Sequence, residues 1–215
     1  MLLEPVWHLL EEQLFTAEAG PGLFNPYADR DGAHDQPDAV AIRQANLRQY
    51  LAAYTARPDV FLLAEAPGPW GCRFSGVPIT SEAQLLDPAF PLSGAQSSAR
   101  LAPHTEYSAN IYWRVMAPYF PRFFTWNSVP FHPFKPGEPF SIRTPKSSEV
   151  KAFGGVLHGL LDLLQPTAVL AIGRKAEYAL NQIGVTATYV RHPSQGGARL
   201  FEAGIHAAFQ DTEIP

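Results

Sequence analysis

The chain has 215 residues, of which 46% are hydrophobic and 17% charged, and its formal net charge is −4 at pH 7. This length predicts one domain with a substantial core, and the lack of an apolar stretch of about 18 residues predicts no membrane span. A single cysteine, Cys72, excludes an internal disulfide and any metal or iron–sulfur site built from cysteines alone.

The N-terminus lacks the basic region and long apolar run of a secretory signal, so we expect a cytoplasmic protein. Residues 1–50 hold eight acidic side chains against three basic ones, which leaves the rest of the chain close to neutral. A neutral body can still present a basic groove, because phosphate attraction depends on local charge. Net charge therefore neither supports nor excludes a nucleic acid as partner.

Two helices are predicted in the N-terminal part of the chain. Apolar residues at helical spacing predict the first over residues 2–16. A stretch rich in Gly, Pro, Asn and Asp over residues 20–37 predicts a loop, and residues 38–54 predict a second helix. We expect residues 1–57 to form a helical cover that belongs to the same globular unit as the main domain, residues 58–215.

From about residue 58 the predicted strands and helices alternate. Short apolar runs predict strands over residues 60–64, 122–129, 167–172 and 186–191. Helices are predicted over residues 106–117, 147–164 and 175–183, with a last helix from about residue 198. Strands joined by helices predict a three-layer α/β/α sandwich around a four-stranded, mainly parallel sheet.

Ligands of such sheets bind at the carboxyl ends of the strands. The loops that follow the four predicted strands read AEAPGPWGCRFSG, NSVPFHPFKPG, IGRKA and RHPSQGG. Three of these four loops hold most of the polar and glycine-rich residues that could carry chemistry. The sequence therefore predicts one site at this edge of the sheet.

Three of these segments resemble motifs of the uracil-DNA glycosylase superfamily. Ala64–Gly68 (AEAPG) is similar to the first motif, in a form closest to the GEAPG of the iron–sulfur branch. Asn127 resembles the central asparagine of that branch, and His192-Pro193-Ser194 matches the second motif. The order of the motifs agrees over roughly residues 58–205. Because the branch holds its cluster with four cysteines, this chain resembles a relative without the cluster, and we expect no cofactor and no metal.

The resemblance implies excision of uracil or a related deaminated base from DNA, after the nucleotide has turned out of the duplex. Positive charge develops on the sugar and negative charge on the departing base, so an anion and hydrogen-bond donors stabilise the transition state. The implied catalytic residues are Glu65, for the water and the sugar, and His192, as a donor to the base O2. Elsewhere in the superfamily an Asp or Asn at the position of Ala66 handles the water.

The resemblance also implies residues that contact the base. Asn127 would pair its amide with the O4 and N3–H of uracil, and Phe74 or Ile79 would stack on the ring. Ala66 and Gly68 would approach the base closely, and glycine at position 68 builds no wall against the thymine 5-methyl group. We therefore expect relaxed base specificity.

The loop after the last predicted strand is the implied contact with DNA. Its candidate residues are Ser194, Gln195, Gly196, Arg199 and Leu200. Ser194 would contact a phosphate, and Arg199 or Leu200 would fill the space that the base leaves. The alternative is a plain turn between strand and helix, with Leu200 as the first core residue of the helix.

Each candidate also has a structural interpretation: Glu65 as a cap of backbone N–H groups, His192 as a buried histidine, Asn127 as a turn residue and Phe74 as core. Two rival functions stay open, a non-catalytic relative that binds damaged DNA and a glycosidase of free nucleosides. His132 lacks partners at metal-ligand spacing, and Cys72 is better explained as part of a packed pocket wall than as a nucleophile. We expect a monomer that acts on DNA.

Overall fold

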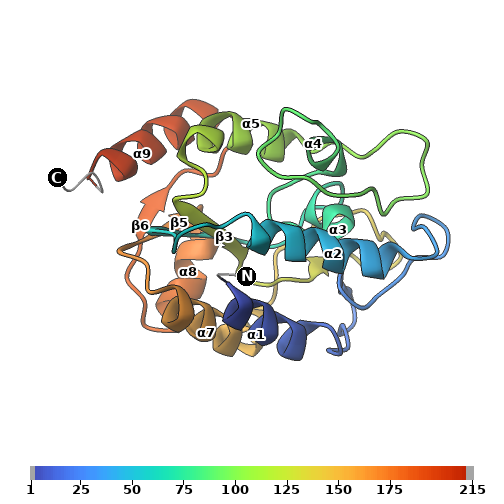
Figure 1. Cartoon of the computed structure of the whole chain (residues 1–215). Coiled ribbons are helices and arrows are strands. Elements are labelled where there is room, and N and C mark those ends of the chain that lie inside the picture. Colours follow the sequence, from blue (N-terminus) through green and yellow to red (C-terminus); the bar gives the residue numbers. More distant parts are fainter. Residues whose placement is uncertain (1–2, 212–215) are drawn as a thin grey trace.

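A computed structural model describes residues 3–211 of the chain (Figure 1). Leu2, at the start of the first predicted helix, and residues 212–215 lie outside the described residues. The central sheet is four-stranded and wholly parallel, with the order β3-β2-β5-β6. Its strands are β2 (Val60–Ala64), β3 (Phe123–Asn127), β5 (Ala168–Ile172) and β6 (Thr188–Val190). The predicted fold class is confirmed.

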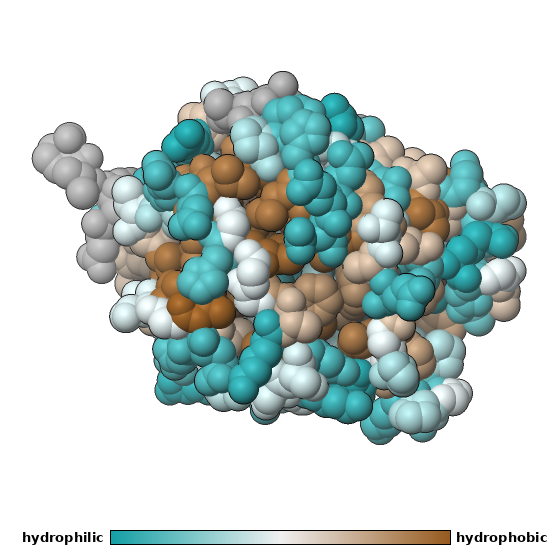
Figure 2. Space-filling model, turned by 90° about the horizontal axis from the view of Figure 1, so that it is seen from below, coloured by the Kyte–Doolittle hydropathy of each residue, from teal (hydrophilic) through white to brown (hydrophobic). Residues whose placement is uncertain are grey.

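Helices cover both faces of the sheet (Figure 1). One layer contains α5 (Tyr107–Met116) and α9 (Ala198–Asp211), and the other contains α1 (Glu4–Leu14), α7 (Gly154–Leu164) and α8 (Arg174–Gln182). Figure 2 views the second layer from below, where hydrophobic side chains show between hydrophilic ones. Because both faces are covered, β2 and β3 are buried at every position; β2 (VFLLA) is a continuous apolar run, whereas β3 (FFTWN) also holds Thr125 and Asn127. None of the helices within residues 3–211 has the length and apolar character that crossing a membrane requires.

The structure differs from the predicted elements in two ways. The helix predicted over residues 147–164 is divided into α6 (Ser147–Ala152) and α7, with Phe153 between them and a pair of glycines directly after it. Glycine is a poor helix former, which accounts for the break. Short elements that were not predicted are β1 (Leu23–Phe24), α3 (Cys72–Ser75), α4 (Glu82–Leu85), η1 (Ala117–Tyr119, which takes the last residue of the helix predicted over 106–117) and β4 (His132–Pro133). Elements this short carry no periodic pattern.

Helix α2 (Ala39–Ala52) and the residues after it cover the outer edge of β3. The Tyr50 hydroxyl accepts a hydrogen bond from the N–H of Thr125 at 2.9 Å, and the Tyr54 hydroxyl donates to the carbonyl of Phe123 at 2.8 Å. β3 is an edge strand, so these buried hydroxyls satisfy backbone groups that a further strand would otherwise pair. Helix α2 and the residues after it thus pack directly on the sheet, whereas α1 packs on α7 and α2. A boundary at residue 57 stays a prediction.

A buried ion cluster ties the N-terminal part to the segment after β2. The carboxylate of Asp35 lies 3.0 Å from Arg43 Nη1 and 3.4 Å from Nη1 of Arg73, which belongs to α3. All three side chains are almost fully buried. Buried charges are tolerated when they are paired, and Asp35 is the carboxylate that the two guanidinium groups share; Arg73 has a second partner in Asp31, at 3.2 Å.

Replacing Asp35 by alanine leaves two buried cations without their shared partner. We expect Asp35→Ala to lower the free energy of unfolding by about 3–5 kcal/mol, measured by urea denaturation. Asp38→Ala is the matched control, because Asp38 is exposed and its side chain does not cap α2; it should change stability by less than about 0.5 kcal/mol. Equal effects of the two substitutions would contradict the role of the cluster.

Candidate active site

Two adjoining cavities open at the carboxyl ends of the strands. The larger has a volume of about 600 Å³ and the smaller about 410 Å³. Both are lined by Glu65, Arg174 and Lys175, which follow the neighbouring strands β2 and β5. The parallel register pairs Ala64 with Asn127, so the chain leaves β2 and β3 at the same level. This is the edge at which the sequence predicts a site.

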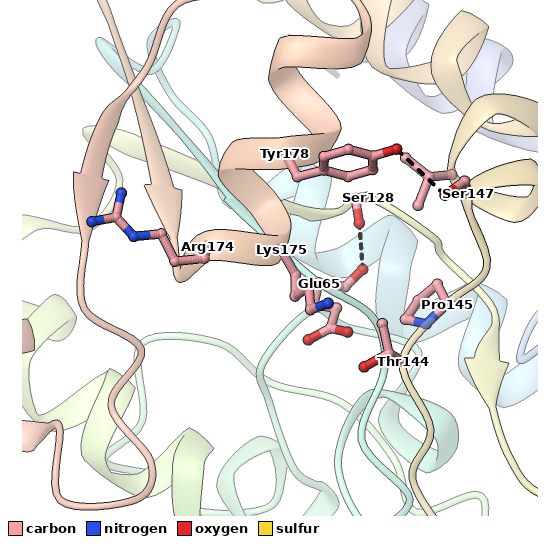
Figure 3. Close-up of a pocket in the computed structure, with 9 residues that line it drawn as sticks. Glu65, Ser128, Thr144, Pro145, Ser147, Arg174, Lys175 and Tyr178 are labelled. Atoms are coloured by element: carbon pink, nitrogen blue, oxygen red, sulfur yellow. Dashed lines mark hydrogen bonds between the residues drawn. The ribbon is translucent and has the colours of Figure 1, made fainter.

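Glu65 stands at the junction of the two cavities. Its backbone is held by the segment after β3, because its carbonyl accepts hydrogen bonds from Ser128 Oγ at 2.6 Å and from the N–H of Val129 at 3.1 Å. Its carboxylate lies toward Lys175 and Thr144 (Figure 3). Burial raises the pKa of the Glu65 carboxyl, whereas the Lys175 cation and a hydrogen bond with Thr144 oppose that rise. These two neighbours favour the ionised form.

His192 follows β6 and lines the larger cavity together with Ser194 and Gln195. The N–H of Ser194 donates to Nδ1 of His192 at 3.2 Å, and the Ser194 hydroxyl lies 2.8 Å from the same nitrogen. Nδ1 is therefore an acceptor, and this network assigns the ring hydrogen to Nε2. Burial, followed by the Arg191 cation, lowers the pKa of His192, so the imidazole is neutral at pH 7 and Nε2 is a donor.

Asn127 ends β3 and is buried beneath the loop that follows β2. Its Nδ2 lies 3.7 Å from the sulfur of Cys72, while its Oδ1 has no hydrogen-bond partner among the described residues. A buried acceptor without a donor costs free energy. Like Phe74, Asn127 is not among the residues that line either cavity. Burial also raises the pKa of Cys72 well above its usual range, and the thiol stays neutral.

The predicted base-contact residues separate into two groups. Ala66, Gly68 and Ile79 line the larger cavity. Ile79 has a φ of 45°, which is unusual for a β-branched residue and marks a strained turn in the cavity wall. Phe74 is fully buried and does not line either cavity; its ring stacks on His104 at 4.1 Å, and the Arg73 guanidinium lies 4.2 Å from its centroid. In this arrangement Ile79, not Phe74, borders the cavity.

The loop after His192 runs from the cavity to the surface. Gln195 lines the cavity with a φ of 52°, and Gly196 follows with a φ of 75° in the same turn. Arg199 and Leu200 are exposed in the first turn of α9, with 64% of Leu200 accessible to solvent. Phe201, the next residue, is the one that enters the core. The alternative in which Leu200 is the first core residue of this helix is therefore wrong.

Two arginines beside the site, and His132, have partners within the protein. Arg143 pairs with Glu149 through two contacts of 2.8 Å, and Arg174 pairs with Glu177 at 2.8 Å. His132 Nδ1 lies 2.8 Å from the carbonyl of Pro67, so this imidazole supports the loop after β2. Within residues 3–211 no group of three His, Cys, Asp or Glu side chains converges as a metal site.

Sequence reasoning missed two residues of the site. Lys175 lies in the loop IGRKA, which follows a predicted strand, so its place in the chain was a usable signal. Glu106 lines the larger cavity but stands directly before α5, in a part of the sequence with no strand end and no motif. Burial raises the pKa of its carboxyl to about 7, against a smaller opposing effect of a hydrogen bond with Ser108. No pattern in the sequence predicted that this residue belongs to the site.

Comparison with known proteins defines the family. The model of the uracil DNA glycosylase superfamily matches residues 52–207, and the chain belongs to that superfamily. Its members are glycosylase-type hydrolases that act on DNA. The fold is similar to the crystal structure of wild-type SMUG2 from Pedobacter heparinus, with a TM-score of 0.67 and 16% sequence identity over 98% of this chain and 97% of that one. A search of curated proteins finds no significant match.

The carboxyl of Glu106 makes the stability of the fold depend on pH. A carboxyl whose pKa is raised on folding stabilises the protein least when it is ionised, so stability falls from about pH 4.5 to about pH 7. We expect the free energy of unfolding of Glu106→Gln, relative to that of the wild type, to rise by about 2–3 kcal/mol as the pH rises from 4 to 8. Urea denaturation at each pH measures this difference. Glu12→Gln, on an exposed position of α1, is the control and should retain the pH dependence of the wild type.

Proposed function

We propose that this protein excises uracil or a related deaminated base from DNA by hydrolysis of the N-glycosidic bond. One observation carries the proposal: a single cavity in the fold of this superfamily brings together Glu65, from the end of β2, and His192, from the end of β6. An anion on one side and a neutral hydrogen-bond donor on the other suit the charges of a glycosidic transition state.

Glu65 is the group proposed to act at the sugar. In its ionised form it can orient a water molecule toward C1′ and stabilise the positive charge that develops on the deoxyribose. Lys175 and Thr144 support this role because they oppose protonation of the carboxylate. Ala66 has no polar side chain to handle the water, so the whole of this task rests on Glu65.

His192 is proposed to act at the base. With Nδ1 occupied as an acceptor, its Nε2–H donates toward the base O2, and the hydrogen bond strengthens as negative charge develops there. Asn127 supplies the recognition of the base. Its unpartnered Oδ1 suits the N3–H of uracil, and its Nδ2 can donate to O4. Cytosine presents the reverse pattern and would leave these buried groups unpaired.

The proposed partner is DNA that contains a deaminated base, bound by a cytoplasmic monomer. Ser194, Gln195 and Gly196 would follow the phosphate backbone, while Arg199 and the exposed Leu200 would enter the duplex where the base has left. The exposure of Leu200 supports this proposal, because a large apolar side chain gains from burial against stacked bases.

The direct test is release of bases from a labelled oligonucleotide panel with uracil, hypoxanthine, xanthine and thymine mismatches. We expect release of at least one deaminated base, with Glu65→Gln and His192→Ala each lowering the single-turnover rate by about a hundredfold. His8→Ala, on an exposed position of α1, is the control. If no base is released while salt-sensitive DNA binding persists, the chain is a non-catalytic relative that binds damaged DNA.

The pH profile provides a separate test of the pair formed by Glu65 and Lys175. Removing the cation in Lys175→Met takes away an interaction that lowers the pKa of Glu65. The acidic limb of the rate profile should therefore move to higher pH, while the rate on the plateau falls less than in Glu65→Gln. Lys151→Met, at an exposed position of α6, should leave the limb in place. An unshifted limb in Lys175→Met would contradict this coupling.

A further inference from the structure

The carboxyl of Glu106 fills the space that two glycines of the site leave empty. A methyl group built on Gly68 or on Gly71 would overlap an oxygen of this carboxyl. Glu106 holds the position before the first turn of α5, yet its side chain makes no capping hydrogen bond to that helix. The carboxyl is instead directed against the loop after β2 and into the larger cavity. It therefore takes the place of the side chain that position 68 lacks.

The segment before α5 is held in place by another glutamate, Glu82, which is fully buried. The Glu82 carboxylate accepts hydrogen bonds from the N–H groups of Ser97 at 2.7 Å, Ser98 at 2.8 Å and His104 at 3.1 Å. The N–H of Ala83 also donates to the carbonyl of His104 at 3.0 Å. Glu82 thus anchors the segment that ends at Glu106, so the carboxyl is a built part of the cavity wall.

We propose that Glu106 is the specificity-determining residue of the base pocket, and that its carboxyl selects deaminated purines by donating a hydrogen bond to N7. This inference rests on the proposed function. It changes the expectation drawn from the sequence, in which Gly68 leaves the pocket without a wall. The wall is present, it comes from a different segment of the chain, and it is polar.

Purines and uracil present different atoms to the wall that Glu106 forms. In the base pose that the resemblance to the superfamily implies, a residue at position 68 would face the edge of a pyrimidine that carries the 5-position, where uracil has only a C–H group. In the same implied pose hypoxanthine or xanthine would present O6 and N1–H to Asn127 as uracil presents O4 and N3–H, and N7 would point toward the same wall. A carboxyl that carries its proton meets this acceptor, whereas uracil leaves it without a partner.

The environment of Glu106 favours the protonated form that this hydrogen bond needs. Burial raises the pKa of the carboxyl to about 7, so a substantial fraction keeps its proton at neutral pH. Ser108 is its hydrogen-bond neighbour, and the buried Cys72 thiol is the titratable group that interacts with it electrostatically. Because the thiol is neutral, it adds no charge to the pocket wall. When the carboxyl ionises, its oxygens repel the N7 lone pair.

The test compares single-turnover release of uracil, hypoxanthine and xanthine by the wild type, Glu106→Ala and Glu106→Gln. We expect Glu106→Ala to lower release of both purines relative to uracil by about tenfold, the effect of one lost hydrogen bond. Glu106→Gln keeps a donor in its amide and should retain most purine release. In the wild type purine release should fall above about pH 7, and Glu106→Gln should lack that fall. If Glu106 had only a structural role, its substitution would lower the release of all three bases to the same extent.

Gly68→Ala gives an independent measure of the same contact. In the wild type the added methyl group displaces the carboxyl, so purine release should fall as it does in Glu106→Ala. In the Glu106→Ala background the methyl group has room, so the second substitution should cost much less than it does alone. This non-additivity is what direct contact between two positions produces. Additive losses in the double variant would overturn the inference. Thermal unfolding of every variant verifies that it is folded.

The outcomes separate this inference from the proposed function. If the wild type releases no base from any oligonucleotide, the proposed function fails and the inference with it. If the wild type releases uracil but neither purine, or if the Glu106 variants keep the base ratios of the wild type, the inference about Glu106 is overturned and the proposed function stands. Glu12→Gln, which removes an exposed carboxylate from α1, should keep all ratios unchanged.

Discussion

The parallel pairing of β2 with β3 is the contact on which the site depends. Its register sets Ala64 beside Asn127, so Glu65 and Asn127 leave the sheet at neighbouring points. β3 has no strand on its other side, and the hydroxyls of Tyr50 and Tyr54 satisfy its outer backbone groups. Helix α2 and the residues after it therefore do more than cover the core, because they hold the strand that presents Asn127.

Two polar groups at the site lower the stability of the folded protein. Asn127 Oδ1 has no partner among the described residues, and the Glu106 carboxyl is held where its ionised form is disfavoured. Other buried carboxylates are well paired, as Asp35 is with two arginines and Glu82 with three backbone N–H groups. Arg73 Nε and Trp126 Nε1 are also buried without a partner among the described residues, but neither residue lines a cavity. For Asn127 Oδ1, we propose that a bound base supplies the missing donor.

The fold was predictable because its signals are local. Strands buried on both faces must be apolar throughout, and VFLLA over residues 60–64 carries that signal without any tertiary information. The single helix predicted over residues 147–164 was wrong because hydrophobic periodicity continues across Phe153 while the backbone does not. Elements of two to four residues, such as β1 and α3, exist only because the surrounding structure holds them.

The sequence by itself determined the parallel sheet, the order of the motifs along the chain and the edge of the sheet at which Glu65 and His192 lie. Residues that directly follow parallel strands must gather at that edge. Only the tertiary structure decided which side chains complete the cavity. It buried Phe74 against His104, left Ile79 at the wall, exposed Leu200 and brought Glu106 against Gly68. Glu106 and Gly68 are separated in the chain by two short helices and a long loop, and contacts between such distant segments leave no periodic or local pattern to recognise.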